Sequence, residues 1–187
     1  HIFSHLNQLE LSTEILMKHP KIKVAEASMD FYKTEQVFAN SEGSLIEQTI
    51  TESGAGAMAV AVEGSEAQGR SYPNSHGGNL ATLGYEFVEE MRLLDNMEKV
   101  REEAVALLSA EPCPSMETNV IISAEQMALQ VHESCGHPIE LDRVLGTEIS
   151  LAGGSFMTLD KLRKLRYGSS KVNITADATV EGALGSF

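Results

Sequence analysis

The stretch KIKVAEASMDFYKTEQVFANSEGSLIEQTITESGAGAMAVAV, residues 21–62, decides the fold class. Its short β-prone runs alternate in part between apolar and polar residues, a pattern typical of strands with one buried face. Residues 40–43, NSEG, stand between two of these runs and contain the residue types that favour a tight turn. The stretch therefore predicts an antiparallel meander of short strands.

Helices are predicted before and after this meander in the sequence. Residues 7–18 place Leu and Ile side chains near helical spacing, and Pro20 ends that helix. Residues 80–110 carry a stripe of Leu, Val and Met and predict one or two helices, with Asp95 and Asn96 as the candidate break and new helix start. The chain is thus predicted to be α+β, an antiparallel sheet with helices packed on one side.

Residues 63–79, EGSEAQGRSYPNSHGGN, are predicted to form a long loop, because Gly, Ser and Asn dominate their composition. A loop of this length inside a compact domain is usually functional or mobile. Arg70, Tyr72 and His76 could contact a ligand there. We expect a solvated loop rather than a binding site.

Two prolines, Pro112 and Pro114, mark the boundary between two predicted domains, residues 1–111 and residues 112–187. The second domain is predicted to open with a strand at residues 118–123. A helix that bears two histidines is expected to follow this strand.

The helix start is signalled by Ser123 with Gln126 three residues later, a pair that fits a capping box. Further along, residues 156–166 space their leucines as in an amphipathic helix. Residues 171–182 have the composition of a strand.

Composition excludes several classes of function. Lys plus Arg number 14 and Asp plus Glu number 27, so the formal net charge of the 187 residues is −13. Such a chain repels phosphate backbones, which argues against nucleic-acid binding. The chain also lacks an uncharged run of the ~20 residues that a membrane helix requires. We therefore expect a soluble cytoplasmic protein without a membrane partner.

His132 and His137 are the most informative candidates for metal ligands. Zinc hydrolases commonly hold two histidines four residues apart on one helix, whereas five residues place them ~140° apart around a regular helix. A shared ion therefore requires the helix to widen by a π-type turn or to stop and bend. Gly136 and Pro138 on either side of the second histidine permit both outcomes. The alternative is a structural role without metal, in which two histidines lie at a helix end, one capping carbonyls and the other packed.

Glu133 directly follows the first histidine and is the candidate general base. A glutamate at this place in helical metallohydrolases lies near the metal but reaches the water, whose proton it can pass to a leaving amine. Zinc lowers the pKa of bound water to about 7, so a carboxylate is a sufficient base at neutral pH.

Several segments, taken in order, resemble the metal-binding, TldD-like branch of the TldD/PmbA family of metalloproteases, once described as modulators of DNA gyrase. These segments are HESCGHPIELDRVLG (residues 132–146), AGGSF (152–156), FANSEGSLIEQ (38–48), GRSYPNSHGGN (69–79) and RYGSSKVNITAD (166–177). The resemblance implies that His132 and His137 are zinc ligands and that Glu133 is the catalytic base.

The sequence departs from the family pattern in its third ligand. Members of the family supply a cysteine from a later part of a longer chain, and no cysteine follows His137 here. We therefore expect a fragment: an N-terminal domain that is incomplete at its start, followed by the beginning of a truncated metallopeptidase domain. Cys135, Glu140 and Asp142 are alternative ligands within the chain, although the two carboxylates are better suited to orienting the histidines.

Two functions follow from the resemblance. The first is a zinc-dependent peptidase that cleaves unfolded or extended peptides, working as a homodimer or as a heterodimer with a homologue. The second is a non-catalytic scaffold or regulatory subunit that pairs with a homologous partner. The isolated fragment is expected to bind metal weakly, because catalytic zinc normally has three protein ligands.

Overall fold

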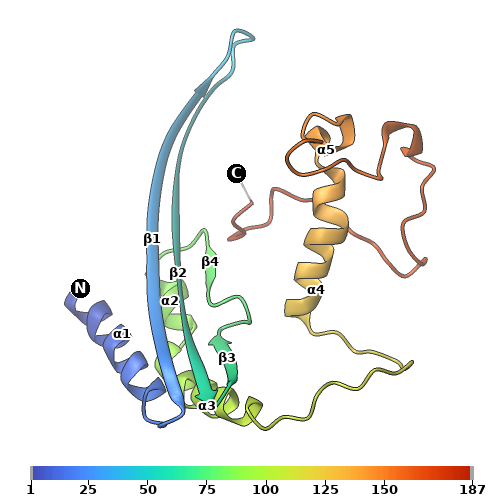
Figure 1. The fold of residues 1–187 in the computed structure, drawn as a ribbon. Helices are drawn as coiled ribbons and strands as arrows, with labels where there is room; N and C mark the ends of the chain where they lie inside the picture. Colours follow the sequence, from blue (N-terminus) through green and yellow to red (C-terminus); the bar gives the residue numbers. More distant parts are fainter. Residues whose placement is uncertain (1, 186–187) are drawn as a thin grey trace. The chain divides into compact units, whose positions relative to one another are not determined.

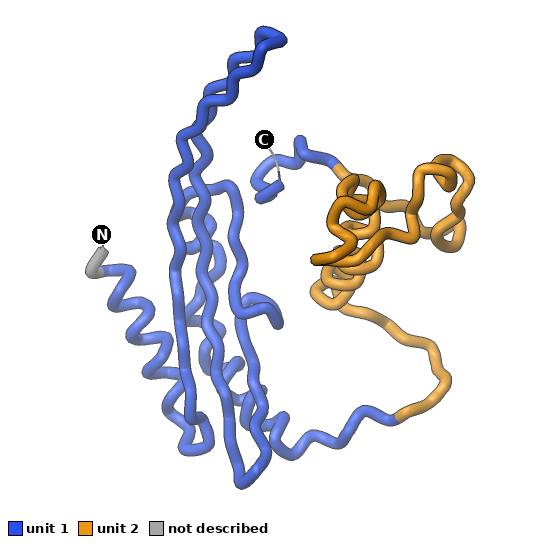
Figure 2. The backbone as a smooth tube through the Cα atoms, turned by 45° about the horizontal axis from the view of Figure 1, so that its top comes forward, with its two compact units in different colours: residues 1–114, 177–187 blue, residues 115–176 orange. Residues whose placement is uncertain are grey.

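The structure is a computed structural model that describes residues 2–185 and divides into two compact units, residues 1–114 with 177–187, and residues 115–176 (Figure 2). The first unit contains α1 (Ile2–Leu16), β1 (Ile22–Ala39), β2 (Leu45–Glu63), β3 (Glu66–Tyr72), β4 (Asn79–Ala81), α2 (Tyr85–Glu90) and α3 (Leu93–Leu107). The second contains α4 (Ala124–Val131), a π-helical turn (His132–Gly136), 3₁₀ turns at His137–Ile139 and Leu159–Lys161, and α5 (Leu141–Leu145).

The sheet of the first unit is antiparallel, as predicted, with the order β1-β2-β3, and β4 pairs with β2. The short runs predicted for the meander join into two long strands, β1 and β2. Their pairing extends from Ile22 opposite Ala61 to Ala39 opposite Leu45. The residues between the predicted runs contain no Pro or Gly breaker in β1, so pairing continues through them.

The predicted turn at residues 40–43 is confirmed. The side-chain oxygen of Asn40 accepts hydrogen bonds from the backbone N–H groups of Glu42 and Ser44. Gly43 has a φ of 94°, a conformation that glycine adopts without steric cost. The turn thereby fixes the register of the whole β1–β2 hairpin.

The core of the first unit lies between the sheet and the helices. Ala57, Ala59 and Ala61 alternate along β2 and are buried on one face, where their small side chains allow α3 to pack closely. The other buried members of this core are Leu16, Ile22, Leu93, Met97, Val100 and Ala104. The α+β prediction, with helices against an antiparallel sheet, is confirmed (Figure 1).

The loop predicted for residues 63–79 is wrong over residues 66–72, because β3 pairs with β2 there. Gly64, with a φ of 61°, begins a tight turn between the two strands. Of the side chains considered for ligand contact, Arg70 forms an ion pair with Glu103 at 2.8 Å. The Tyr72 hydroxyl donates to the carbonyl of Met91 at 2.6 Å. Both residues attach β3 to the helices.

Two glycines of β2 permit the chain to cross the sheet face that lies opposite the helices. A Cβ atom on Gly54 would overlap the carbonyl oxygen of Asn79, and one on Gly56 would overlap the carbonyl oxygen of Gly77. Only glycine allows this backbone approach. β4 can therefore pair with β2 just beyond this crossing.

The helices of the first unit differ from the prediction in their boundaries. α1 includes the predicted helix at residues 7–18 except its last two residues, and it begins earlier. The break between α2 and α3 lies at Met91 and Arg92, not at residues 95–96. Arg92 adopts a φ of 49° and pairs with Asp95 in the first turn of α3. Asp95 therefore stabilises the helix start from within the helix.

The β1–β2 hairpin extends beyond the helices as a two-stranded arm (Figure 1). The large apolar side chains near its tip, Val37, Phe38, Leu45 and Ile46, are more than half exposed. No helix among the described residues is long and apolar enough to cross a membrane.

In the second half of the chain, three predictions are wrong. Residues 118–123 form no strand, and Ile121 is fully exposed. The helix predicted for residues 156–166 is reduced to the 3₁₀ turn Leu159–Lys161, and the backbone leaves the helical conformation at Leu162, which has a ψ of 128°. Residues 171–182 also form no strand within the described structure. A β-prone segment becomes a strand only where a partner strand pairs with it.

Candidate metal centre

α4 carries the first histidine and begins where the sequence indicated. The Ser123 hydroxyl accepts the backbone N–H of Gln126, which satisfies one of the unpaired donors at the helix start. This confirms the half of the predicted capping box in which the Ser123 side chain caps the helix. His132 follows the last residue of α4 and enters the widened turn.

The helix widens between the two histidines, as the five-residue spacing predicted. The backbone N–H of His137 donates to the carbonyl of His132, a bond over five residues that defines a π-turn. Directly after it, a 3₁₀ turn with Pro138 near its start ends the helix. Both predicted distortions, the widening of the helix and its end, are therefore present one after the other.

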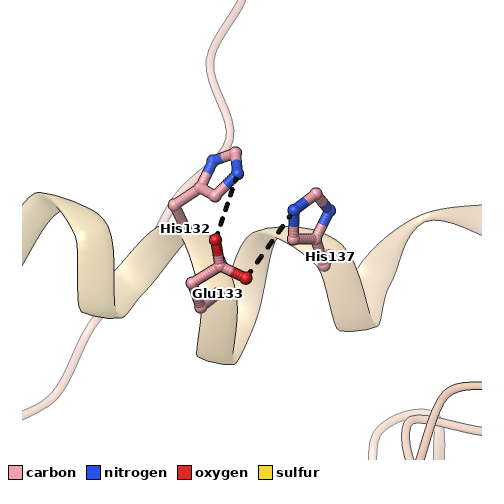
Figure 3. A group of neighbouring side chains, drawn as sticks. All are labelled: His132, Glu133 and His137. Carbon is pink, nitrogen blue, oxygen red and sulfur yellow. Dashed lines mark ion pairs between the residues drawn. The ribbon is translucent and has the colours of Figure 1, made fainter. Parts of the chain in front are cut away.

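The π-turn gathers His132, Glu133 and His137, one side-chain ligand atom from each lying within 4.8 Å of the others (Figure 3). Each imidazole Nε2 is 3.9 Å from an oxygen of Glu133. The ring centroids are 4.4 Å apart, with the ring planes at 75°. The His132 side chain is 60% exposed and that of His137 is 27% exposed, so the group opens toward solvent at His132.

Glu140 holds the ring of His137 from its other side. Nδ1 of His137 is 2.7 Å from Oε1 of Glu140, and the other carboxylate oxygen of Glu140 is 2.8 Å from Nε of Arg143. The hydrogen bond with His137 lowers the pKa of the Glu140 carboxyl more than partial desolvation raises it, and Arg143 lowers it further. This contact leaves Nε2 of His137 facing Glu133, the arrangement by which proteins orient a metal-binding imidazole.

The alternative ligands lie in other contacts. Cys135 is buried and is not part of the group formed by the two histidines and Glu133. Glu140 also belongs to a second group of carboxylates, with Asp142 and Glu148. Arg143 lies among these carboxylates, 4.0 Å from Glu148, and supplies a positive charge that a cation would otherwise provide.

Two hydroxyl groups that sequence reasoning missed bind carbonyls of the irregular segment. The Tyr167 hydroxyl donates to the carbonyl of Ser134 at 3.1 Å, and the Ser155 hydroxyl donates to the carbonyl of Pro138 at 2.6 Å. The sequence did carry one signal. Pro138 has no N–H, so the carbonyl of Ser134, four residues earlier, cannot form the usual helical bond and needs another donor.

A pocket of about 580 Å³ adjoins His132. One wall is the helical segment that carries the histidine, and the other is the irregular chain at residues 166–176. Its apolar lining residues are Val131, Ile139, Met157, Val172 and Ile174. The pocket can therefore accept an apolar group next to the histidines.

The geometry defines a candidate metal site: two imidazoles and a carboxylate lie together on one helical segment and could hold an ion. Comparison with known proteins points to metallopeptidases. Residues 8–110 match the family model described as the PmbA/TldA metallopeptidase central domain. This match covers more than half of the chain, which therefore belongs to the PmbA/TldD family.

Two archaeal relatives extend the match beyond the central domain. A protein of Methanocaldococcus jannaschii named as a metalloprotease is 33% identical over 171 residues, covering 91% of this chain and 35% of its own length. A protein of Methanothermobacter thermautotrophicus, also named as a metalloprotease, is 34% identical over 155 residues. The match covers 83% of this chain and 31% of that protein's length. The chain thus spans about a third of the length of these relatives. No solved structure gives a significant match.

Proposed function

We propose that this chain carries the metal-binding and proton-transfer residues of a zinc-dependent peptidase. The observation that carries the proposal is the π-turn, which brings together two imidazoles that a regular helix would separate and places them beside the Glu133 carboxylate. Membership of the PmbA/TldD family and the names of the two relatives support the same activity.

The donor set fits a zinc ion. Imidazole nitrogen and carboxylate oxygen are ordinary zinc ligands, and His132 and His137 would hold the ion through Nε2. The hydrogen bond of Glu140 to Nδ1 of His137 favours the tautomer in which Nε2 is free of a proton. A bound ion would polarise the substrate carbonyl and make water more acidic.

Glu133 is proposed as the general base and not as a ligand. Its oxygens lie 3.9 Å from each imidazole Nε2, so the carboxylate lies beside the ligand atoms and is 60% exposed to incoming water. From this place it can accept a proton from the attacking water and deliver it to the departing amine of the peptide. It supplies both proton transfers without moving to another site.

The proposed substrate is an unfolded or extended peptide. A peptide whose scissile carbonyl lies near the histidines would place a neighbouring side chain at the 580 Å³ pocket, whose lining includes Val131, Ile139, Met157, Val172 and Ile174. Residues 169–176, which contain a turn at 170–171 and no strand, form one wall of this pocket. We therefore propose a preference for an apolar residue close to the cleaved bond.

A second candidate function is that of a scaffold or regulatory subunit that pairs with a homologue. The exposed arm of β1 and β2 favours it, because four large apolar side chains gather near the tip. Exposed apolar patches of this kind commonly mark contacts between proteins. Pairing through the arm is compatible with catalysis, so a homodimer or heterodimer is proposed in either case.

One experiment tests the peptidase proposal and separates it from the scaffold. In the full-length protein, Glu133→Gln should keep bound zinc within about twofold and lose peptide hydrolysis by about 10²-fold or more. Glu117→Gln, which changes an exposed carboxylate of the same unit, is the control and should change neither quantity. Unchanged hydrolysis by Glu133→Gln would remove Glu133 from the mechanism. No hydrolysis by the unaltered protein would favour the scaffold.

A further inference from the structure

We infer that Tyr167 is a positioning residue, whose hydroxyl holds the π-turn in the form that brings His132 and His137 together. This inference rests on the proposed function, since it assigns Tyr167 a role in metal binding. Tyr167 lies thirty residues beyond the histidines in sequence and is not a ligand itself. It acts through the backbone of the turn.

The hydrogen bond of Tyr167 goes to the carbonyl that the helix cannot satisfy. Its hydroxyl donates to the Ser134 carbonyl at 3.1 Å. In a regular helix this carbonyl would accept the N–H of the residue four positions later, which is Pro138 and has none. One position earlier, the N–H of His137 goes to His132, five residues back. The side-chain hydroxyl therefore supplies a donor where the helical pattern fails.

Tyr167, which is 45% exposed, has further contacts within the same unit. Its ring stacks on Phe156 with centroids 6.1 Å apart and planes at 18°. Tyr167 and the buried Cys135, a residue of the π-turn, also line the same pocket. A few residues earlier, Ser155 donates to the Pro138 carbonyl at 2.6 Å. Side-chain hydroxyls thus bind the irregular segment at two carbonyls, on either side of His137.

The consequence for metal binding follows from helix geometry. Two residues five apart on a regular helix point ~140° away from each other, so relaxation of the turn would separate the imidazoles. Without the Tyr167 hydroxyl, the Ser134 carbonyl would seek water or another backbone donor. The turn would then spend less time in the form that binds the ion, and the measured affinity would fall in proportion.

The test is Tyr167→Phe in the full-length protein, a change that keeps the aromatic ring and removes only the hydroxyl. Zinc affinity is measured by competition with a chromophoric chelator, and the absorption spectrum of the cobalt-loaded protein reports the ligand geometry. We expect zinc binding to weaken about tenfold, the usual effect of removing a group that orients a metal ligand. Tyr32→Phe, which removes an exposed hydroxyl from β1, is the matched control and should bind zinc as the unaltered protein does.

The outcomes separate this inference from the function on which it rests. If the unaltered protein binds zinc and Tyr167→Phe binds it equally well, the positioning role is overturned while the zinc site stands. A lower melting temperature of the metal-free protein with unchanged zinc affinity and cobalt spectrum also overturns it, because that pattern indicates a purely structural role. No zinc binding by the unaltered protein would overturn both.

A second variant keeps the inference testable if Tyr167→Phe alone does not fold. Pro138→Ala supplies the missing N–H, so the Ser134 carbonyl gains a backbone donor. In that background, loss of the Tyr167 hydroxyl should change zinc affinity by less than about twofold, because the two donors serve one acceptor. A tenfold loss in the double variant relative to Pro138→Ala would show that Tyr167 acts elsewhere, and would overturn the inference.

Discussion

The backbone N–H of His137 donates to the carbonyl of His132, so that one widened helical turn joins the two imidazoles. A π-turn contains one residue more than the α-helical turn it replaces. The site can therefore be regarded as an α-helical pair of histidines, four residues apart, into which one residue has been inserted. This relationship leads to the first prediction.

Deletion of Ser134 should restore a regular helix and keep both histidines on one face. The remaining spacing of four residues corresponds to ~40° around the helix axis, which suits a shared ion. We expect zinc affinity within about tenfold of the unaltered full-length protein, measured by chelator competition. Insertion of an alanine after Ser134 should abolish binding, because six residues leave the rings ~120° apart. Loss of zinc in the deletion variant would contradict this account of the turn.

Gly56→Ala should strongly destabilise the first unit. The new Cβ atom would overlap the backbone of residues 77–78, which cannot move without separating β4 from β2. We expect the free energy of unfolding to fall by about 3 kcal/mol, measured by urea denaturation. Gly69→Ala in β3 is the control. Its nearest contacts would be at 3.9 Å, so its effect should stay below about 1 kcal/mol.

Ser53→Ala should leave a carbonyl of the first unit without its donor. The buried Ser53 hydroxyl donates to the carbonyl of Gly84 at 2.5 Å, and this bond ties β2 to the start of α2. We expect a loss of about 1–3 kcal/mol in the free energy of unfolding. Ser28→Ala, at an exposed position on β1, should change it by less than about 0.5 kcal/mol. Equal effects of the two changes would show that the bond is not stabilising.

The pKa of the Glu140 carboxyl should lie below its usual value of about 4.3 and should rise when His137 is replaced by Ala. The histidine hydrogen bond favours the ionised carboxylate in the folded state, so this contribution to stability is present above the unfolded pKa. It is lost as the pH falls from about 4.3 through the lower folded pKa. Titration followed by carboxyl NMR measures the shift. An unchanged Glu140 pKa in His137→Ala would assign the shift to Arg143 instead.

The parts of the molecule that were predictable from sequence are those fixed by nearby residues. Ser123 and Gln126 set the start of α4, and Asn40 with Gly43 sets the hairpin turn, because each pair acts within four residues. The distortion between the histidines was predictable for the same reason, since it follows from the five-residue spacing and from Pro138.

The remaining features depend on partners that are distant in sequence. Residues 66–72 have the composition of a loop and become β3 because β2 offers its edge, whereas residues 118–123 have the composition of a strand and find no partner strand within the described structure. Tyr167 could not be connected with Ser134 by spacing alone. Pro138 shows in the sequence that the Ser134 carbonyl lacks its helical donor. The sequence does not show that Tyr167 supplies the replacement.

The β1–β2 hairpin also constrains the order of folding. Its buried alanines lie at the end farthest from the turn, where Ala25 pairs with Ala59, so folding from the buried end must first close a loop of 34 residues. Relative to the turn, whose ends Asn40 and Ser44 are four positions apart in sequence, that closure costs only about 2 kcal/mol more. Burial of a few methyl groups at ~0.8 kcal/mol each offsets this cost. The strands are therefore expected to zip from the core outward, and the exposed arm to form last.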